Sequence, residues 1–293
     1  MVFLGKIVAA IFAWGAYVVL RLAGWKRKTV MANAKHVASP VNYDELLFNL
    51  TRHVGELLFC FGTFKKLPHD FTAYPCRVDG WDFALDEAAI PVLEKMRSGG
   101  IFLTAHYGNY EAMGPWLCRL GIPLVASYIP VKPKWLNNIL ERKIRAVDGR
   151  SYSVDARTPR DFLRILNDGK LFCLLSDQDS RIPSAIDGTL LGQPANVNPL
   201  PDFLLTHRPQ TPVFICWMEE ICGIRVLHAI EVEGPQVASP ARLASPAPSP
   251  SQSSVVNSQF NKWLEERICE NPNLWYSFTH RRFYSQSPEI YGE

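Results

Sequence analysis

Apolar residues open the chain in one long run. Residues 7–24 are apolar except for Arg21, with Lys6 before the run and a basic cluster at residues 26–28 after it. A helix of this length is just long enough to cross a bilayer. This run has three interpretations: a cleaved signal peptide, a retained membrane anchor or a buried core helix. We expect an anchor over residues 1–30, because the basic cluster separates the run from small residues that resemble a cleavage site.

A helical spacing of apolar residues comes next. Apolar residues recur every three or four positions from Leu46 to Phe61, which predicts an amphipathic helix. Asn42 and Asp44, just before it, are residue types that cap a helix at its amino-terminal end. The apolar stripe of this helix could rest on a membrane, line a channel for an acyl chain or pack against the rest of the fold.

Helical and strand-like patterns alternate from residue 86 onward. The predicted helices cover residues 86–96, 111–120, 135–147, 158–169, 201–207 and 258–270. The predicted strands cover residues 101–105, 123–129, 151–154, 170–176, 212–218 and 224–231. Such alternation is typical of an α/β fold with a mostly parallel sheet flanked by helices, here preceded by a hydrophobic membrane helix.

Composition adds information on the domain, its partners and its thiols. We expect residues 31–293 to form one domain, in which the Pro/Ala/Ser-rich residues 235–254 form a flexible loop. The net charge of +3 is too small to indicate nucleic acid as a partner. Seven scattered cysteines without a CxxC pair argue against a metal site and favour reduced thiols.

A histidine at the end of a predicted strand is the first candidate for chemistry. The strand at residues 101–105 leads into His106, Gly108 and Asn109 interrupt the pattern, and Glu111 opens a helix. In open α/β sheets ligands bind beyond the carboxyl ends of the strands. A carboxylate near an imidazole fixes its tautomer and raises its basicity, which suits the ring to take a proton from a hydroxyl. Spacing alone leaves a structural histidine as the alternative.

Several well-known catalytic motifs are missing from the sequence. It contains no GxSxG, no Walker loop, no GxGxxG after a strand and no HExxH. These absences argue against a nucleophile-elbow hydrolase, a nucleotide-driven enzyme and a zinc protease.

Several short strings resemble one family when they are taken in order. Residues 106–111, HYGNYE, resemble the HxxxxE/D motif of the bacterial lipid A biosynthesis acyltransferases, the late lauroyl- and myristoyl-transferring family of the lysophospholipid-acyltransferase-like superfamily. Residues 171–179, LFCLLSDQD, resemble its strand ending in D-Q/H-D. Residues 190–192 stand in the place of its F-F-G, and residues 211–213 match its G-A-P-V strand. Residues 272–283 resemble its P-E-Q-x-x-W-x-H-R-R-F tail, so the resemblance covers roughly residues 1–285.

The resemblance implies an acyltransferase whose catalytic domain is residues 31–293. A fatty acyl group would pass from a thioester of acyl carrier protein or coenzyme A to a hydroxyl of a lipid A-type glycolipid. His106 would be the general base and Glu111 would orient it. A thioester already has a good leaving group, so no covalent acyl-enzyme, cofactor or metal is expected. The enzyme would lie at the bacterial inner membrane with its catalytic domain facing the cytoplasm.

The resemblance also implies substrate-binding residues. Arg145 would contact an anionic group, while Asp177 and Asp179 would be acceptor-side or structural carboxylates. A solvated helix face is the alternative for Arg145, and a strand-end turn is the alternative for the two aspartates. The remaining substrate-binding candidates are Asn109, Lys132, Arg281 and Arg282.

The sequence departs from the family pattern at four places. Tyr110 replaces a tryptophan, Ile129 replaces an arginine, leucines replace two phenylalanines at residues 190–191, and Phe278 replaces a tryptophan. These changes leave the reaction class intact and the acceptor open. The alternatives are therefore the same chemistry on another phosphoglycolipid or a lysophospholipid, or a non-catalytic, membrane-tethered lipid-binding protein.

Overall fold

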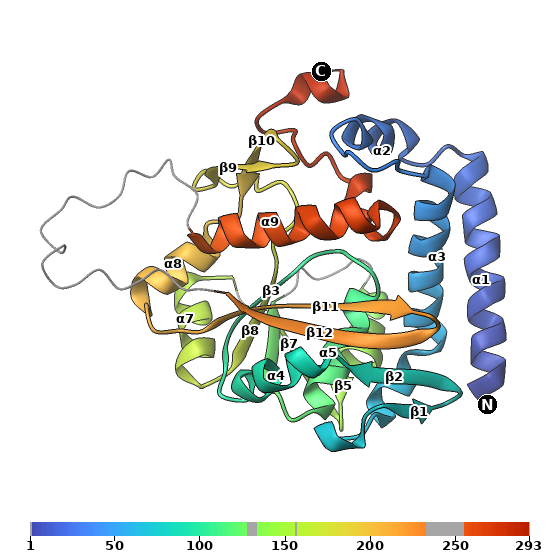
Figure 1. Cartoon of the computed structure of the whole chain (residues 1–293), viewed down its shortest axis with the longest axis vertical. Coiled ribbons are helices and arrows are strands. Elements are labelled where there is room, and N and C mark those ends of the chain that lie inside the picture. The colour runs from blue at the N-terminus through green and yellow to red at the C-terminus, as the bar shows by residue number, and fades with distance from the viewer. Residues whose placement is uncertain (1, 128–133, 156, 233–254, 293) are drawn as a thin grey trace, which may run out of the picture.

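A mixed sheet with helices on both faces forms the centre of the protein (Figure 1). The computed structural model describes residues 2–127, 134–155, 157–232 and 255–292. Within these ranges the main sheet has eight strands in the order β1-β2-β12-β11-β3-β8-β4-β7. The strands are β1 (Cys76–Val78), β2 (Trp81–Leu85), β3 (Gly100–Thr104), β4 (Leu124–Ser127), β7 (Ser153–Val154), β8 (Leu171–Leu175), β11 (Val213–Ile221) and β12 (Ile224–Val232).

Most neighbouring strands are parallel, which confirms the predicted α/β class. The pairs from β11 through β3, β8 and β4 to β7 are all parallel, and so is the pair β12–β2. The hairpins β11–β12 and β1–β2 are antiparallel. All five residues of β3 are buried, as expected for a central parallel strand covered on both faces.

Two apolar cores lie on opposite faces of the sheet because successive strand side chains point in opposite directions. Ile101 and Leu103 of β3 join one core, and Phe102 between them joins the other. The first core receives α7 (Pro159–Asn167), α8 (Leu200–His207) and α9 (Val255–Glu270). The second receives α4 (Ile90–Met96) and α5 (Tyr110–Arg119).

The amino-terminal helices form a layer at one edge of the molecule (Figure 1). They are α1 (Val2–Leu22), α2 (Arg27–Ala34) and α3 (Tyr43–Phe59). Asn42 caps α3 as predicted, because its side chain accepts from the backbone N–H groups of Asp44 and Glu45. Leu46 and Leu47 of α3 are fully buried in the first core, so this part of the stripe packs against the fold.

One described helix is long and apolar enough to cross a membrane. It covers Leu4–Leu22, and only 11% of its most apolar stretch is buried within the structure. Length and composition alone are weak evidence for a membrane span, since a signal sequence or a core helix can be equally long and apolar. The low burial argues against the core-helix interpretation.

Several element boundaries differ from the prediction. The helix expected over residues 135–147 stops early: α6 (Lys134–Ile139) continues into a π-helical turn, η4 (Leu140–Ile144). The strands β5 (Ala146–Val147) and β6 (Arg150–Ser151) then form a hairpin. Asp148 and Gly149 between them have positive φ angles and make the turn of this hairpin.

A second hairpin has no counterpart in the prediction. It joins β9 (Ile186–Leu190) to β10 (Gln193–Val197) through Leu191 and Gly192, both at positive φ. The predicted loop at residues 235–254 lies outside the described residues. The remaining short elements are the 3₁₀ turns η1 (Phe61–Lys66), η2 (Phe71–Ala73), η3 (Glu87–Ala89), η6 (Pro272–Leu274), η7 (Tyr276–Thr279) and η8 (Pro288–Tyr291).

Candidate active site

Two neighbouring parallel strands bring His106 and Asp177 together. Thr104 of β3 is paired with Leu175 of β8, and the backbone N–H of Ser176 still donates to the carbonyl of Thr104 at 3.1 Å. His106 lies two residues beyond Thr104, and Asp177 lies two residues beyond Leu175. The strand register therefore places both side chains at the carboxyl edge of the sheet, where ligands bind in such folds.

Asp177 is a fully buried carboxylate that receives four hydrogen bonds. Its Oδ1 accepts from Nδ1 of His106 at 2.8 Å, and its Oδ2 accepts from the His106 backbone N–H at 3.0 Å. Trp275 Nε1 at 2.9 Å and Ser277 Oγ at 2.6 Å also donate to Oδ2. Burial alone would raise the pKa of Asp177, but the charge of His106 and these hydrogen bonds hold it well below its usual range.

The ionised carboxylate fixes the tautomer of His106. A carboxylate can only accept, so Nδ1 carries the ring proton and Nε2 keeps a lone pair. Burial lowers the pKa of His106, but the charge and hydrogen bond of Asp177, together with the charge of Glu111, raise it above its ordinary value. The side chain is 20% exposed. A neutral imidazole of raised basicity is suited to remove a proton from a hydroxyl.

The carboxy-terminal segment closes this side of the site. Tyr107 forms an isolated antiparallel bridge with Trp275. The N–H of Gly108 donates to the carbonyl of Leu274 at 3.0 Å, and the N–H of Tyr276 donates to the carbonyl of His106 at 2.8 Å. The tail thus runs beside the loop that follows β3 and delivers the donors of Trp275 and Ser277 to Asp177.

Glu111 has a different partner from the one predicted. Its Oε1 accepts from Nη2 of Arg145 at 2.8 Å, and both side chains are largely buried. The ring of His106 is oriented by the hydrogen bond that its Nδ1 donates to Asp177, and Glu111 acts on the ring through its charge. The reason is that α5 begins at Tyr110, which leaves Glu111 in its first turn beside Arg145.

A small apolar cavity adjoins this ion pair. Its volume is about 70 Å³, and Glu111 and Arg145 form its polar wall. Tyr110 also lines it, and the ring of Tyr110 lies edge-on to that of His106 with centroids 4.9 Å apart. The apolar part of the lining includes Phe102, Met113, Leu124, Ala126 and Leu175. An alkyl group could therefore lie beside the polar residues of the site.

Asn109 connects the site to α3. Its Oδ1 accepts from Nδ1 of His53 at 3.1 Å, and its Nδ2 donates to Glu56 at 2.9 Å. Burial lowers the pKa of His53 to about 4, so the ring is neutral. Within the described part of the chain its buried Nε2 has no hydrogen-bond partner. The contacts of Asn109 suit a positioning role for the loop after His106.

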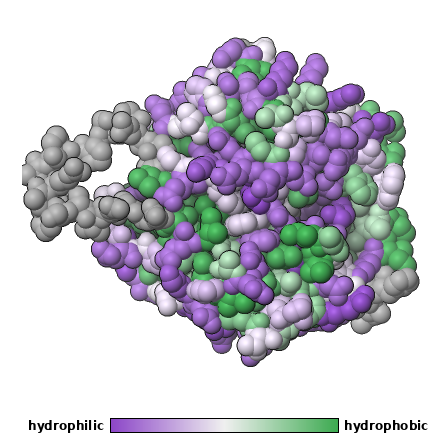
Figure 2. Space-filling model, viewed as in Figure 1, coloured by the Kyte–Doolittle hydropathy of each residue, from purple (hydrophilic) through white to green (hydrophobic). Residues whose placement is uncertain are grey.

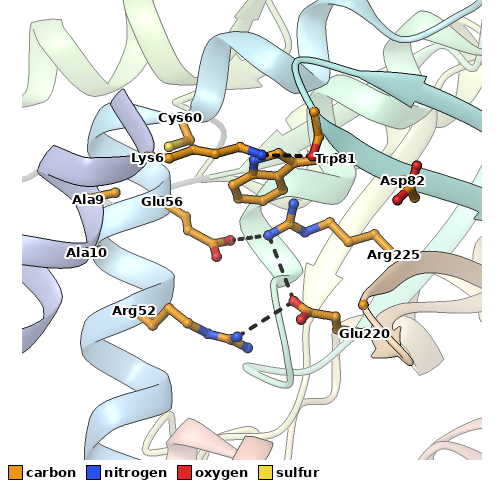
Figure 3. A pocket seen from close by; sticks show the side chains of 12 residues that line it. Lys6, Ala9, Ala10, Arg52, Glu56, Cys60, Trp81, Asp82, Glu220 and Arg225 are labelled. Carbon is orange, nitrogen blue, oxygen red and sulfur yellow. Dashed lines mark hydrogen bonds and ion pairs between the residues drawn. The ribbon is translucent and has the colours of Figure 1, made fainter. Parts of the chain in front are cut away.

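The same α3 face lines a charged cavity of about 320 Å³ next to α1 (Figure 3). Arg225 of β12 pairs with Glu56 at 3.0 Å and lies 3.9 Å from Glu220, which also faces Arg52 at 3.7 Å. Lys6 of α1 reaches over the Trp81 ring to the carbonyl of Gly80 at 2.9 Å. This network joins three layers of the fold: α1, α3 and the sheet.

The other predicted residues lie in different surroundings. Asp179 is held by Arg181 and Ser285. Arg282, a predicted substrate-binding residue, is fully buried and donates to the carbonyl of Asn196. Arg281 packs over the rings of Tyr284 and Tyr291. Lys132 lies outside the described residues.

Comparison with known proteins found no relative of this chain. No protein-family model matches the chain, and no curated protein matches its sequence. Among the described residues, no group of three or more His, Cys, Asp or Glu side chains could hold a metal ion.

Three residues of the site were not identified from the sequence. His53 lies in a predicted amphipathic helix and gave no signal of its own. Trp275 and Ser277 lie in the tail singled out by the family resemblance, but they are 98 and 100 residues from Asp177 in the chain. No spacing rule connects residues so far apart.

Proposed function

We propose that this protein is a membrane-associated O-acyltransferase that uses His106 as its general base. The observation that carries the proposal is the His106–Asp177 hydrogen bond of 2.8 Å at the carboxyl edge of the sheet, beside a cavity with apolar walls. The family resemblance supplies the substrates: a thioester of acyl carrier protein or coenzyme A as donor, and a lipid A-type glycolipid as acceptor. The location would be the bacterial inner membrane, with the site facing the cytoplasm.

The proposed reaction has two steps. The acceptor oxygen attacks the thioester carbonyl carbon while its proton passes to Nε2 of His106, which gives a tetrahedral oxyanion and an imidazolium. The carbon–sulfur bond then breaks, the ester forms and the imidazolium returns the proton to the departing thiolate. Asp177 stabilises the imidazolium between these steps, as a buried carboxylate does in a catalytic triad.

Replacing the base tests the proposal. His106→Ala should lower acyl transfer by roughly 10²- to 10⁴-fold, because the acceptor hydroxyl loses its base. Release of free thiol from the acyl thioester, with and without lipid acceptor, measures the rate. His207→Ala is the control, since His207 is exposed at the end of α8. Normal transfer by the His106 variant would exclude this mechanism.

The same assay separates the alternatives. Thiol release that depends on acceptor supports a transferase, while release without acceptor indicates a thioesterase. Lipid binding without thiol release indicates a non-catalytic binding protein. Mass spectra of lipids from cells with and without the protein would report the acyl chain and the acceptor together, which distinguishes a lipid A-type glycolipid from another phosphoglycolipid or a lysophospholipid.

A further inference from the structure

Helix α1 packs against α3 along its whole length. At one end, a Cβ atom on Gly5 would lie 3.0 Å from the carbonyl oxygen of Phe59. One turn further along α1, a Cβ atom on Gly55 would lie 2.7 Å from the carbonyl oxygen of Ala9. At the other end, Arg21 Nε pairs with Asp44 at 2.8 Å. The two helices are therefore antiparallel and lie side by side (Figure 1).

This pairing prevents α1 from crossing a bilayer alone. Any depth reached by α1 is also reached by α3, which carries Arg52 and Glu56 in its carboxy-terminal half. Glu56 is tied to Arg225 of the sheet, so the sheet edge would follow α3 into the hydrocarbon. Arg52 and its partner Glu220 at this edge are 42% and 38% exposed, and burying such charged groups in lipid is strongly unfavourable.

Separating the two helices would also be unfavourable. Phe12 packs against Phe59 with ring centroids 5.7 Å apart, and Trp14 packs against Phe48 at 5.5 Å. A free α1 would expose Phe48 and the close-packed backbone at Gly55, and would uncover more of Phe59, which is already 43% exposed. The folded pair accordingly limits membrane contact to the outward face of α1.

That outward face is apolar. None of residues 7–20 is charged. The exposed side chains of the face, which are 41% to 79% exposed, are Leu4, Ile7, Ile11, Trp14, Val18, Val19 and Leu22. Hydrophobic residues gather along the edge of the molecule that α1 occupies (Figure 2). Helices on the surface of soluble proteins carry polar residues on this side.

Two observations indicate that lipid covers the face. Lys26, Arg27 and Lys28 are exposed just beyond α1 and complement anionic headgroups. Trp14 lies close to the middle of the helix. In a spanning orientation it would sit near the bilayer centre, whereas tryptophan is enriched at the membrane–water interface.

We infer that α1 lies in the plane of an anionic membrane surface, with this face inserted among the lipids, and does not span the bilayer. The inference concerns how the chain binds a membrane and is independent of acyl transfer. It implies that α3 and the charged cavity lie behind α1, on the side of the helix that faces away from the lipid.

A depth measurement tests the orientation. Nitroxide labels would be attached at Leu4→Cys, Ile11→Cys or Val18→Cys of the full chain, in a background in which the exposed Cys222 and Cys269 are serine. The protein is bound to vesicles of phosphatidylethanolamine and phosphatidylglycerol, and accessibility to oxygen and to a water-soluble nickel complex reports depth. We expect similar, shallow depths at all three positions. A maximum at Ile11, with both ends near water, would show a spanning helix and overturn the inference.

The same labels test the other possible occupant, a second copy of the chain. The stripe at residues 4, 7, 11, 14 and 18 also has the spacing of a coiled-coil seam. Strong coupling between labels that persists after lipid is added, without access to oxygen, would show a dimer interface and overturn the inference.

Charge reversal supplies an independent measurement. Lys26→Glu/Lys28→Glu should weaken binding to the phosphatidylglycerol vesicles by roughly tenfold or more. Lys170→Glu/Lys262→Glu is the matched control, with exposed lysines just before β8 and in α9, and should change binding less than twofold. Equal weakening by both pairs would contradict docking through the α1 end of the molecule.

Discussion

At the scale of single residues, the site depends on one buried charge. Asp177 is fully buried, and four donors from the loop after β3 and from the tail compensate its carboxylate. Removing one member of a buried charged pair leaves the other uncompensated. His106 therefore owes its tautomer and its raised pKa mainly to Asp177, with a smaller effect from Glu111.

Asp177→Asn should move the pH dependence of the reaction. A general base works only when neutral, so the rate rises as pH passes above the pKa of His106. Asp177 raises that pKa, and the variant should therefore shift the acidic limb of the rate profile to lower pH. The maximal rate should also fall by roughly 10²-fold or more, because the amide can hold the wrong tautomer.

Glu111→Gln is the comparison for this prediction. It removes a charge that also raises the pKa of His106, but keeps the hydrogen bond that Nδ1 of His106 donates to Asp177. Its acidic limb should shift in the same direction by a smaller amount. A larger shift for Glu111→Gln than for Asp177→Asn would show that the charge of Glu111, and not Asp177, has the larger effect on the pKa of the base.

At the scale of elements, local sequence patterns predicted a helix or strand correctly where the packing of the fold favours the same element. The helix at residues 158–169 is an example: Thr158 and Asp161 form a reciprocal cap, and α7 extends from Pro159 to Asn167. The prediction of one helix over residues 135–147 was wrong at its carboxy-terminal end. The turn at Asp148 and the burial of Ala146 and Val147 favour a short hairpin there. Periodicity alone does not detect such a change.

Gly55→Ala tests the close approach of α1 and α3. Alanine normally favours a helix by about 1 kcal/mol over glycine. Here the added methyl would meet the backbone of Ala9, and overpacking typically costs roughly 1–3 kcal/mol. We expect faster amide hydrogen exchange throughout α1, with little change in β3 and β8.

Gly62→Ala is the matched control for this substitution. A Cβ atom at Gly62 meets nothing within 4 Å, so the exchange of α1 should stay as in the unmodified protein. Unchanged exchange in the Gly55 variant would show that the two helices can separate slightly without loss of stability.

At the scale of the whole molecule, the site is assembled from distant parts of the chain. Loop 105–109, Asp177 and the tail at residues 274–277 meet at one sheet edge, and α3 supports them through His53 and Glu56. Folding thus couples the stability of the protein to the protonation of buried groups. His53 provides the clearest case, because its ring is buried and neutral.

His53→Asn should reduce the dependence of stability on pH. The pKa of His53 falls from an ordinary 6.5 to about 4 on folding, so the unfolded chain binds more protons between these values and the fold loses stability as pH falls through this window. At about pH 5 the shifted pKa of His53 lowers the free energy of unfolding by roughly 2 kcal/mol relative to neutral pH.

Urea unfolding of the protein and the variant measures this loss. Asparagine keeps a donor for Asn109 but cannot titrate, so the stability difference between the two proteins should narrow by roughly 2 kcal/mol between about pH 7 and pH 5. A constant difference across this range would show that His53 titrates normally in the folded protein.

The sequence by itself determined the α/β class, the capped helices, the apolar amino-terminal run and His106 at a strand end. These features depend on contacts between near neighbours in the chain, which periodicity and capping rules describe. The tertiary structure decided that Asp177 and not Glu111 hydrogen-bonds His106, that Trp275 and Ser277 complete its partners, and that α1 lies along α3. Those outcomes depend on strand register and on packing between residues far apart in the chain, and no local pattern encodes either of them.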